Sequence, residues 1–209
     1  MSAEEWFRNS KWDLAIEKAF FARLARSRTQ RDQYLVIQAL TLTKNHPQIA
    51  LQLVEMYFDT AKGEFNDVRA LSARADALME LARFDEALVA MREILSTEQR
   101  RPNQKTRTFV DYPFLVATRK LRSEYEHAMR TLEDRANDAV FPVDHFKWHA
   151  AASLIHADCQ EQAQARSHAQ QALLAAQIDR SSFRFHGSLG LVGEEHRAVV
   201  EALQELADS

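Results

Sequence analysis

The chain has few of the residues that interrupt helices or cross-link a fold. Its 209 residues include 4 glycines, 4 prolines and 1 cysteine. So few glycines and prolines leave little turn chemistry for a protein of many short strands. With Cys159 as the only cysteine, an intrachain disulfide is excluded, and this fits a reducing compartment.

Long apolar runs and a strong charge of one sign are also missing. There is no stretch of about 20 apolar residues, so the sequence predicts no membrane-spanning helix. The net charge of -3 gives no reason to expect nucleic-acid or membrane partners. No basic region followed by an apolar run opens the sequence, so we expect no signal peptide and a cytoplasmic location.

The residues that are abundant favour helices. Hydrophobic residues make up 46% and charged residues 27% of the chain, as in ordinary globular proteins. Alanine, leucine, glutamate, glutamine and arginine dominate, and all five are helix formers. The composition therefore predicts an all-α fold.

The stretch Ala77–Leu95 shows the plan of the chain most clearly, as two helices joined by a tight turn. In its second helix, apolar residues recur at i, i+3, i+4, i+7, i+10 and i+11: Phe84, Ala87, Leu88, Met91, Ile94 and Leu95. This spacing places them on one helical face. Ala87 is small, which allows the two antiparallel helices to pack closely.

The same pattern recurs along the chain. Its small residues align at Ala15, Ala50, Ala87, Ala128 and Ala165, with separations of 35, 37, 41 and 37 residues. A second apolar helical segment precedes each of the last four copies. The repeating unit is therefore a helix hairpin.

The hairpin resembles the tetratricopeptide repeat (TPR) family. The best match is Ala75–Leu95, and together with Leu71 just before it the motif's small and large positions are occupied by Leu71, Ala75, Leu78, Phe84, Ala87, Met91 and Leu95. The resemblance covers residues 11–177, although Ala75 stands where the motif has glycine. The chain is also similar to uncharacterised bacterial TPR-like proteins at Trp6–Asn9 and Phe141–His149, which implies no function.

The resemblance implies a right-handed α-solenoid of about four hairpins within a single domain, 1–209. We expect an N-terminal cap helix, four hairpins, a glycine-containing loop and a C-terminal cap helix, at residues 11–26, 30–60, 65–98, 109–138, 143–177, 180–193 and 194–207. In the loop, we expect Phe183 and Phe185 to cover apolar surface, and Arg184 and His186 to face outward.

The resemblance also implies a non-enzymatic scaffold or adaptor that binds a peptide or partner protein on its concave face. Residues one helical turn from the packing stripe of each first helix are the predicted groove: Leu35, Ala39, Leu42, Ser72, Asp76, Met79, Ala117, Lys120, Ala150 and Leu154. We expect no catalytic residues, no cofactor and no metal. A homodimer formed through exposed cap faces stays open.

One alternative is a metal-linked or small-molecule enzyme that uses the region of His149, His156 and Cys159. His145, His149 and His156 share one face of a helix, and imidazoles bind transition metals. Against this, the three lie in a line about 16 Å long, too far to meet at one ion. Packing positions for His149 and His156 are the simpler interpretation.

A basic cluster is the other candidate for binding. It comprises Arg100, Arg101, Lys105, Arg107, Arg119, Lys120 and Arg122, against the one acid Asp111. This cluster could dock an acidic partner or a phosphate-bearing ligand, although a solvated surface run is the simpler interpretation.

Overall fold

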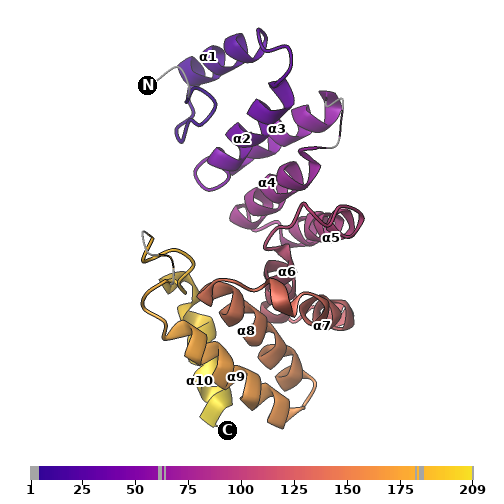
Figure 1. The fold of residues 1–209 in the computed structure, drawn as a ribbon, viewed down its shortest axis with the longest axis vertical. Coiled ribbons are helices and arrows are strands. Elements are labelled where there is room, and N and C mark those ends of the chain that lie inside the picture. Colours follow the sequence, from indigo (N-terminus) through magenta and orange to yellow (C-terminus); the bar gives the residue numbers. More distant parts are fainter. Residues whose placement is uncertain (1–4, 61–62, 64, 182, 184–185, 209) are drawn as a thin grey trace. The chain divides into compact units, whose positions relative to one another are not determined.

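The computed structural model describes residues 5–60, 63, 65–181, 183 and 186–208 (Figure 1). Within these residues the structure is all-helical and contains no strand, which confirms the all-α prediction. The α-helices are α1 Leu14–Leu24, α2 Arg31–Leu42, α3 Pro47–Thr60, α4 Asp67–Glu80, α5 Phe84–Arg100, α6 Thr108–Thr118, α7 Tyr125–Asp134, α8 Pro142–Asp158, α9 Gln162–Ala176 and α10 Arg197–Asp208. Three short 3-10 helices are η1 Arg122–Glu124, η2 Ala136–Asp138 and η3 Glu194–His196.

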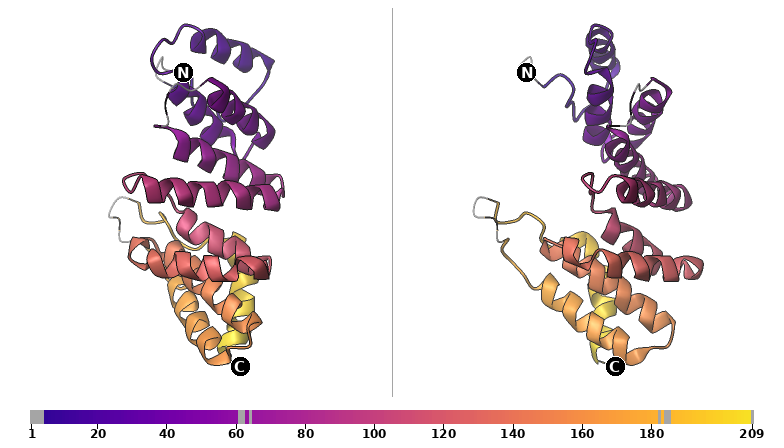
Figure 2. Two further views of the ribbon diagram at one scale, coloured as in Figure 1. Left: turned by 90° about the vertical axis from the view of Figure 1, so that its right-hand side faces the viewer. Right: turned by 45° about the vertical axis from the view of Figure 1, so that its right-hand side comes forward.

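The chain divides into two compact units, Met1–Thr106 and Arg107–Ser209. In unit 1, α2 pairs with α3 and α4 pairs with α5, and α4 also packs against both helices of the hairpin before it (Figure 2). The two hairpins span residues 31–60 and 67–100, and their ends lie within two residues of the expected segments 30–60 and 65–98. One continuous array over the whole chain stays a prediction.

The small residues of the repeat lie where paired helices meet. Ala50 and Ala87 are completely buried, and large side chains such as Leu53 and Ile94 fill the adjoining core. A larger side chain at either alanine would force the helices apart, since protein interiors are close-packed. Ala15 differs from the other copies because it is exposed on α1.

The segment before α1 is fixed to unit 1 by rings and amides. Trp6 meets the Tyr34 ring of α2 edge-on and Phe7 stacks on it, with ring centroids 4.8 and 4.6 Å apart. The buried amide of Gln38 exchanges three hydrogen bonds of 2.8–3.0 Å with Asn9. Trp6 and Phe7 are therefore half-buried packing residues rather than an exposed aromatic pair.

The first helices of three hairpins end in the same way. Ala82, Lys120 and Gln160, which follow α4, α6 and α8, adopt positive φ angles of 55°, 53° and 65°. The next amide bonds back to a carbonyl in the last turn of the helix in each case, over 2.9–3.0 Å. This left-handed cap stops the helix and turns the chain into its partner. It is a repeated backbone feature that the side-chain pattern alone does not reveal.

Unit 2 contains two more hairpins and a final helix. α6 pairs with α7, α8 pairs with α9, and α8 packs against both α6 and α7. α10 lies alongside α9 and also contacts α8 (Figure 1). Phe146, Ala169 and Leu203 form the core that these three helices share.

None of the helices in the described part of the chain has the length and apolar character needed to cross a membrane.

Candidate functional site

Half of the predicted groove residues are buried, so their assignment to an open groove is wrong. The five are Leu35, Ala39, Leu42, Ala117 and Ala150. The first three pack with Phe20 and Leu24 in the core of unit 1, and Ala150 packs with Phe146 in unit 2. A first helix such as α2 contacts both its own partner and the next hairpin, so a second stripe is buried as well.

The other five predicted residues reach solvent to different extents and stay a prediction as partner contacts. Ser72, Met79 and Leu154 are half-buried, whereas Asp76 and Lys120 are exposed. The Ser72 hydroxyl donates to a carbonyl of its own helix. Lys120 lies in the left-handed turn after α6 and not on a helix face.

The segment between α9 and α10 contacts α6 and the beginning of α8. The Gly190 carbonyl accepts a hydrogen bond of 2.8 Å from the Val143 amide, and the Phe183 ring stacks on Phe141 at 5.3 Å. Phe183 thus covers apolar surface as expected, although it stays 40% exposed. His186 is exposed, while Arg184 and Phe185 lie outside the described residues.

The His196 ring also contacts α6 and α8. It lies 5.4 Å from the Phe114 ring of α6 and 5.3 Å from the Phe146 ring of α8. Desolvation and the nearby Lys147 ammonium lower the pKa of His196. Contacts that a partner would need on the first helices of unit 2 are therefore made in part by the protein's own C-terminal region.

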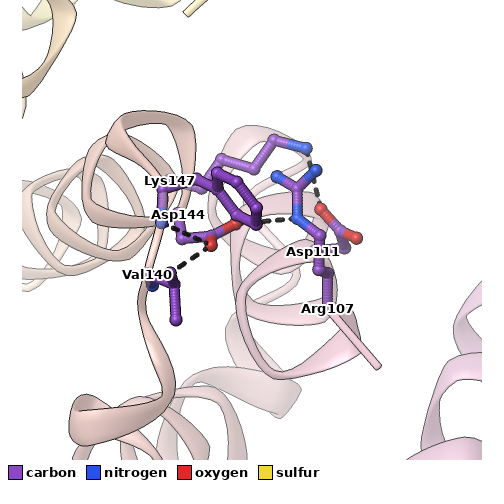
Figure 3. Close-up of polar contacts among 6 residues, drawn as sticks. Arg107, Asp111, Val140, Asp144 and Lys147 are labelled. Carbon is purple, nitrogen blue, oxygen red and sulfur yellow. Dashed lines mark hydrogen bonds and ion pairs between the residues drawn. The ribbon is translucent and has the colours of Figure 1, made fainter. Parts of the chain in front are cut away.

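Four charged residues of unit 2 form a paired network that organises the start of α8 (Figure 3). The buried Asp144 accepts from Arg107 Nε at 2.7 Å, and its other oxygen accepts from the Val140 and Phe141 amides. Lys147 Nζ lies 2.7 Å from Asp111. Because Asp144 satisfies amides ahead of α8, this network is a structural cap rather than a ligand site.

Part of the predicted basic cluster is held in such pairs. Arg107 bonds to Asp144, and Arg122 binds Asp158 through two hydrogen bonds of 2.7 and 3.0 Å. These contacts use cations that an acidic partner or a phosphate would need. They favour the simpler interpretation of this cluster as a surface with local ion pairs.

Three histidines meet between α8 and α9. His149 Nδ1 lies 3.1 Å from His168 Nδ1, and the His156 ring stacks on the His168 ring with centroids 5.5 Å apart and planes 4° apart. His156 also contacts Glu161 over 2.5 Å. Burial, followed by the His168 and His145 charges, lowers the pKa of His149 to about 4.

An enzyme that uses this region stays a prediction. Cys159 is exposed at the end of α8, while His149 and His156 contact His168 and Glu161. Among the described residues, no group of three or more histidine, cysteine, aspartate or glutamate side chains is placed to hold a metal ion. Sequence reasoning missed His168, whose signal was its position three residues after Ala165 on the packing face of α9.

Unit 1 contains a cleft of about 530 Å³. Its walls are α3 and α5, its base is α4, and its lining residues are Gln48, Leu51, Gln52, Glu55, Arg74, Leu78, Arg83, Glu86, Val89, Ala90 and Glu93. The α3 and α5 residues each follow the spacing i, i+3, i+4 and i+7, so each helix presents one stripe to the cleft. We call this hollow the α3–α5 cleft.

The buried part of the lining of the α3–α5 cleft is apolar, and one wall carries an exposed hydrophobic residue. Leu78 and Ala90 are almost fully buried beneath it. Val89, in contrast, is 56% exposed. An apolar side chain from a partner would therefore find apolar surface both below it and beside it.

The polar rim of the cleft consists largely of ion pairs. Arg74 lies 2.7 Å from Glu55, and Arg83 makes two bonds of 2.6 Å to Glu86. The hydrogen bond between Arg83 and Glu86 lowers the pKa of Glu86 and raises that of Arg83. Glu93 is exposed at the far end of the α5 stripe.

A smaller hollow of about 240 Å³ lies between α1 and the segment before it. Its lining is mainly apolar, with Trp6, Ile16 and Phe20, and the Arg23 guanidinium lies 6.0 Å from the centroid of the Trp6 ring. Its size suits a single side chain rather than a peptide segment. The α3–α5 cleft is therefore the stronger candidate site.

Comparisons of the chain with protein-family models, with curated proteins and with solved structures found no match.

Proposed function

We propose that the protein is a non-enzymatic protein-interaction module whose partner docks a peptide segment in the α3–α5 cleft. The cleft itself carries this proposal, because it combines the buried apolar residues Leu78 and Ala90 with two helical stripes. A volume of about 530 Å³ is sufficient for several side chains of a peptide. Such grooves between helices commonly receive a partner helix.

We further propose that the four hairpins are repeats of an α-solenoid of the tetratricopeptide type. Within unit 1, α4 packs against both helices of the preceding hairpin, and within unit 2, α8 does the same. The left-handed caps after α4, α6 and α8 repeat with the hairpins. Both features support a common repeat with a common manner of stacking.

The location differs from the groove that the sequence predicts. The predicted groove uses the first helices of the hairpins, whereas α3 and α5 are second helices. In unit 2, His196 and Phe183 already contact the region of the first helices. The α3–α5 cleft, by contrast, is lined by side chains that reach solvent at Val89 and Glu93, and this supports it as the docking surface.

A peptide selection tests the proposal. A displayed library of random peptides, each long enough for about three helical turns, is selected on the wild-type protein. Binders are then measured on Val89→Arg, which places a bulky charge in the cleft. Leu174→Arg is the matched control, since Leu174 of α9 is 57% exposed and Val89 is 56% exposed.

The expected result is a set of peptides that bind wild type and Leu174→Arg equally and bind Val89→Arg at least roughly tenfold more weakly, as loss of a central contact in an interface would give. Both substitutions change exposed positions, so neither should unfold the protein. If no selected peptide depends on Val89, the cleft is not the docking surface and the proposal fails.

A further inference from the structure

The helices that form the walls of the α3–α5 cleft have an excess of acidic residues. α3 contains Glu55 and Asp59 and no lysine or arginine. α5 contains four acids and two arginines: Asp85, Glu86, Glu93, Glu98, Arg92 and Arg100. Each of the two helices therefore has a net side-chain charge of -2, whereas the whole chain has a net charge of -3.

Three of these acids, Asp59, Asp85 and Glu98, are not among the residues that line the cleft, and Glu98 can be set aside altogether. Glu98 is buried and accepts hydrogen bonds from the backbone and side chain of Thr106. The other acids on the two walls are exposed. Even without Glu98, the acids of the walls outnumber the cations by five to two.

The cations in the cleft lining do not cancel this excess. Arg74 is held by Glu55, and its guanidinium lies 4.7 Å from the centroid of the Phe58 ring. Arg83 is held by Glu86. After these two pairs, Glu93 is the remaining charge in the lining, and it is exposed to an incoming group.

The shape of the cleft limits the length of the occupant. Each stripe covers seven residue steps, from Gln48 to Glu55 and from Glu86 to Glu93. At 1.5 Å per residue this is about 10 Å, or two helical turns. Val89 and Leu51 are the apolar positions of the two stripes nearest to solvent, so a short apolar face on the occupant fits between them.

We propose that the occupant of the α3–α5 cleft is a short amphipathic helix of a partner protein, with an apolar stripe flanked by lysine or arginine. This inference rests on the proposed function, since it names the partner chemistry of the same cleft. The apolar stripe covers Val89 and Leu51, and a flanking cation pairs with Glu93. Charge complementarity of this kind raises association rates and excludes acidic competitors.

The peptides selected on the wild-type protein provide the first test. Those that depend on Val89 are compared with the unselected library for the content of basic and acidic residues beside their apolar positions. The expected result is enrichment of lysine and arginine and depletion of aspartate and glutamate. Val89-dependent peptides with neutral or acidic flanks would overturn this inference while leaving the proposed function standing.

A charge reversal tests the role of Glu93 directly. The tightest Val89-dependent peptide is titrated into Glu93→Lys and into Glu201→Lys, a matched reversal at an exposed position of α10. We expect Glu93→Lys to weaken binding roughly five- to tenfold and Glu201→Lys to leave it unchanged, as for one partly exposed charge pair.

Raised salt should reduce the difference between the wild type and Glu93→Lys. Equal effects of the two reversals would show a general attraction between an acidic protein and a cation, and would contradict a specific pairing at Glu93. The loss of Val89-dependent binders altogether is a different result, because it contradicts the proposed function itself.

Discussion

Mild acid is expected to destabilise the α8–α9 hairpin through His149. Its Nδ1 lies 3.1 Å from that of His168, so one of these two nitrogens donates a hydrogen bond and the other accepts it. If both rings were protonated, two N–H groups and two positive charges would meet in a half-buried space. The charge of His145 also acts against protonation of His149, whereas Glu161 contacts His156 and not His149.

The size of the effect follows from the pKa of His149. Its ordinary value of 6.5 falls to about 4 in the folded protein, mainly because burial disfavours the charged ring. That difference corresponds to about 3 kcal/mol. Since part of the ring reaches solvent, we take about 2 kcal/mol as the stability at stake.

The sign is set by which state binds the proton more tightly. Between pH 6.5 and about 4 the unfolded chain binds a proton at His149 and the folded chain does not. The stability that depends on the neutral ring is therefore complete above about pH 6.5 and is lost as the pH falls through this range. The lowered pKa values of His168 and His196 act in the same direction.

Urea denaturation at pH 7 and at pH 4.5, together with an NMR titration of the histidine rings, provides the assay. We expect His149→Leu to remove about 2 kcal/mol of the difference in unfolding free energy between the two pH values. His186→Gln, at an exposed position, is the control and should leave that difference unchanged. Titration of His149 near its ordinary pKa would refute the reasoning.

Three further substitutions test the packing of the two units. Asp144→Asn removes a carboxylate that is 3% exposed and ion-paired, so thermal denaturation should show a loss of about 1–3 kcal/mol, whereas Glu126→Gln in an exposed pair should cost less than about 0.5 kcal/mol. Gln38→Leu removes three hydrogen bonds from the half-buried Asn9, two at its backbone groups and one at its side-chain amide, and urea denaturation should show a loss of about 1–3 kcal/mol. Gly190→Ala places a methyl group at φ 72° against the Phe141 ring, so we expect about 1–3 kcal/mol of strain and faster hydrogen exchange at the start of α8. An unchanged midpoint or exchange rate in any of these would contradict the contact concerned.

The helical class of the protein could be predicted because it depends on local spacing. A helix hairpin needs small and large apolar residues at fixed positions, and Ala50, Ala87, Ala128 and Ala165 show that spacing directly. All four are buried in the structure. The pairing of helices thus follows from residues close together in sequence.

The groove could not be located from the same pattern. Spacing identifies a helix face, but it does not show how many neighbours the helix has. The spacing assigns Leu35 and Ala39 to the open face of α2, away from its partner helix. They are nevertheless buried, because α2 contacts both α3 and α4. Only contacts between separate hairpins decide which faces stay open.

A weaker signal for the cleft was present in the sequence. Val89 is apolar but lies outside the packing stripe of α5, which runs through Ala87, Leu88 and Met91. A single apolar residue on a solvent face is common, however, so Val89 alone does not identify a contact surface. The segment that carries Gly190 and His196 gave no such signal, since its contacts with α6 and α8 join residues far apart in sequence.

The footprint of a bound peptide tests the central claim most directly. Chemical-shift changes in the amides of the protein are mapped while a Val89-dependent peptide is added, with the side-chain amides of Gln48 and Gln52 as reporters inside the cleft. We predict that the largest changes lie on the α3 and α5 stripes. Changes centred instead on Ser72 and Met79, the first-helix groove of the sequence prediction, would contradict docking in the α3–α5 cleft.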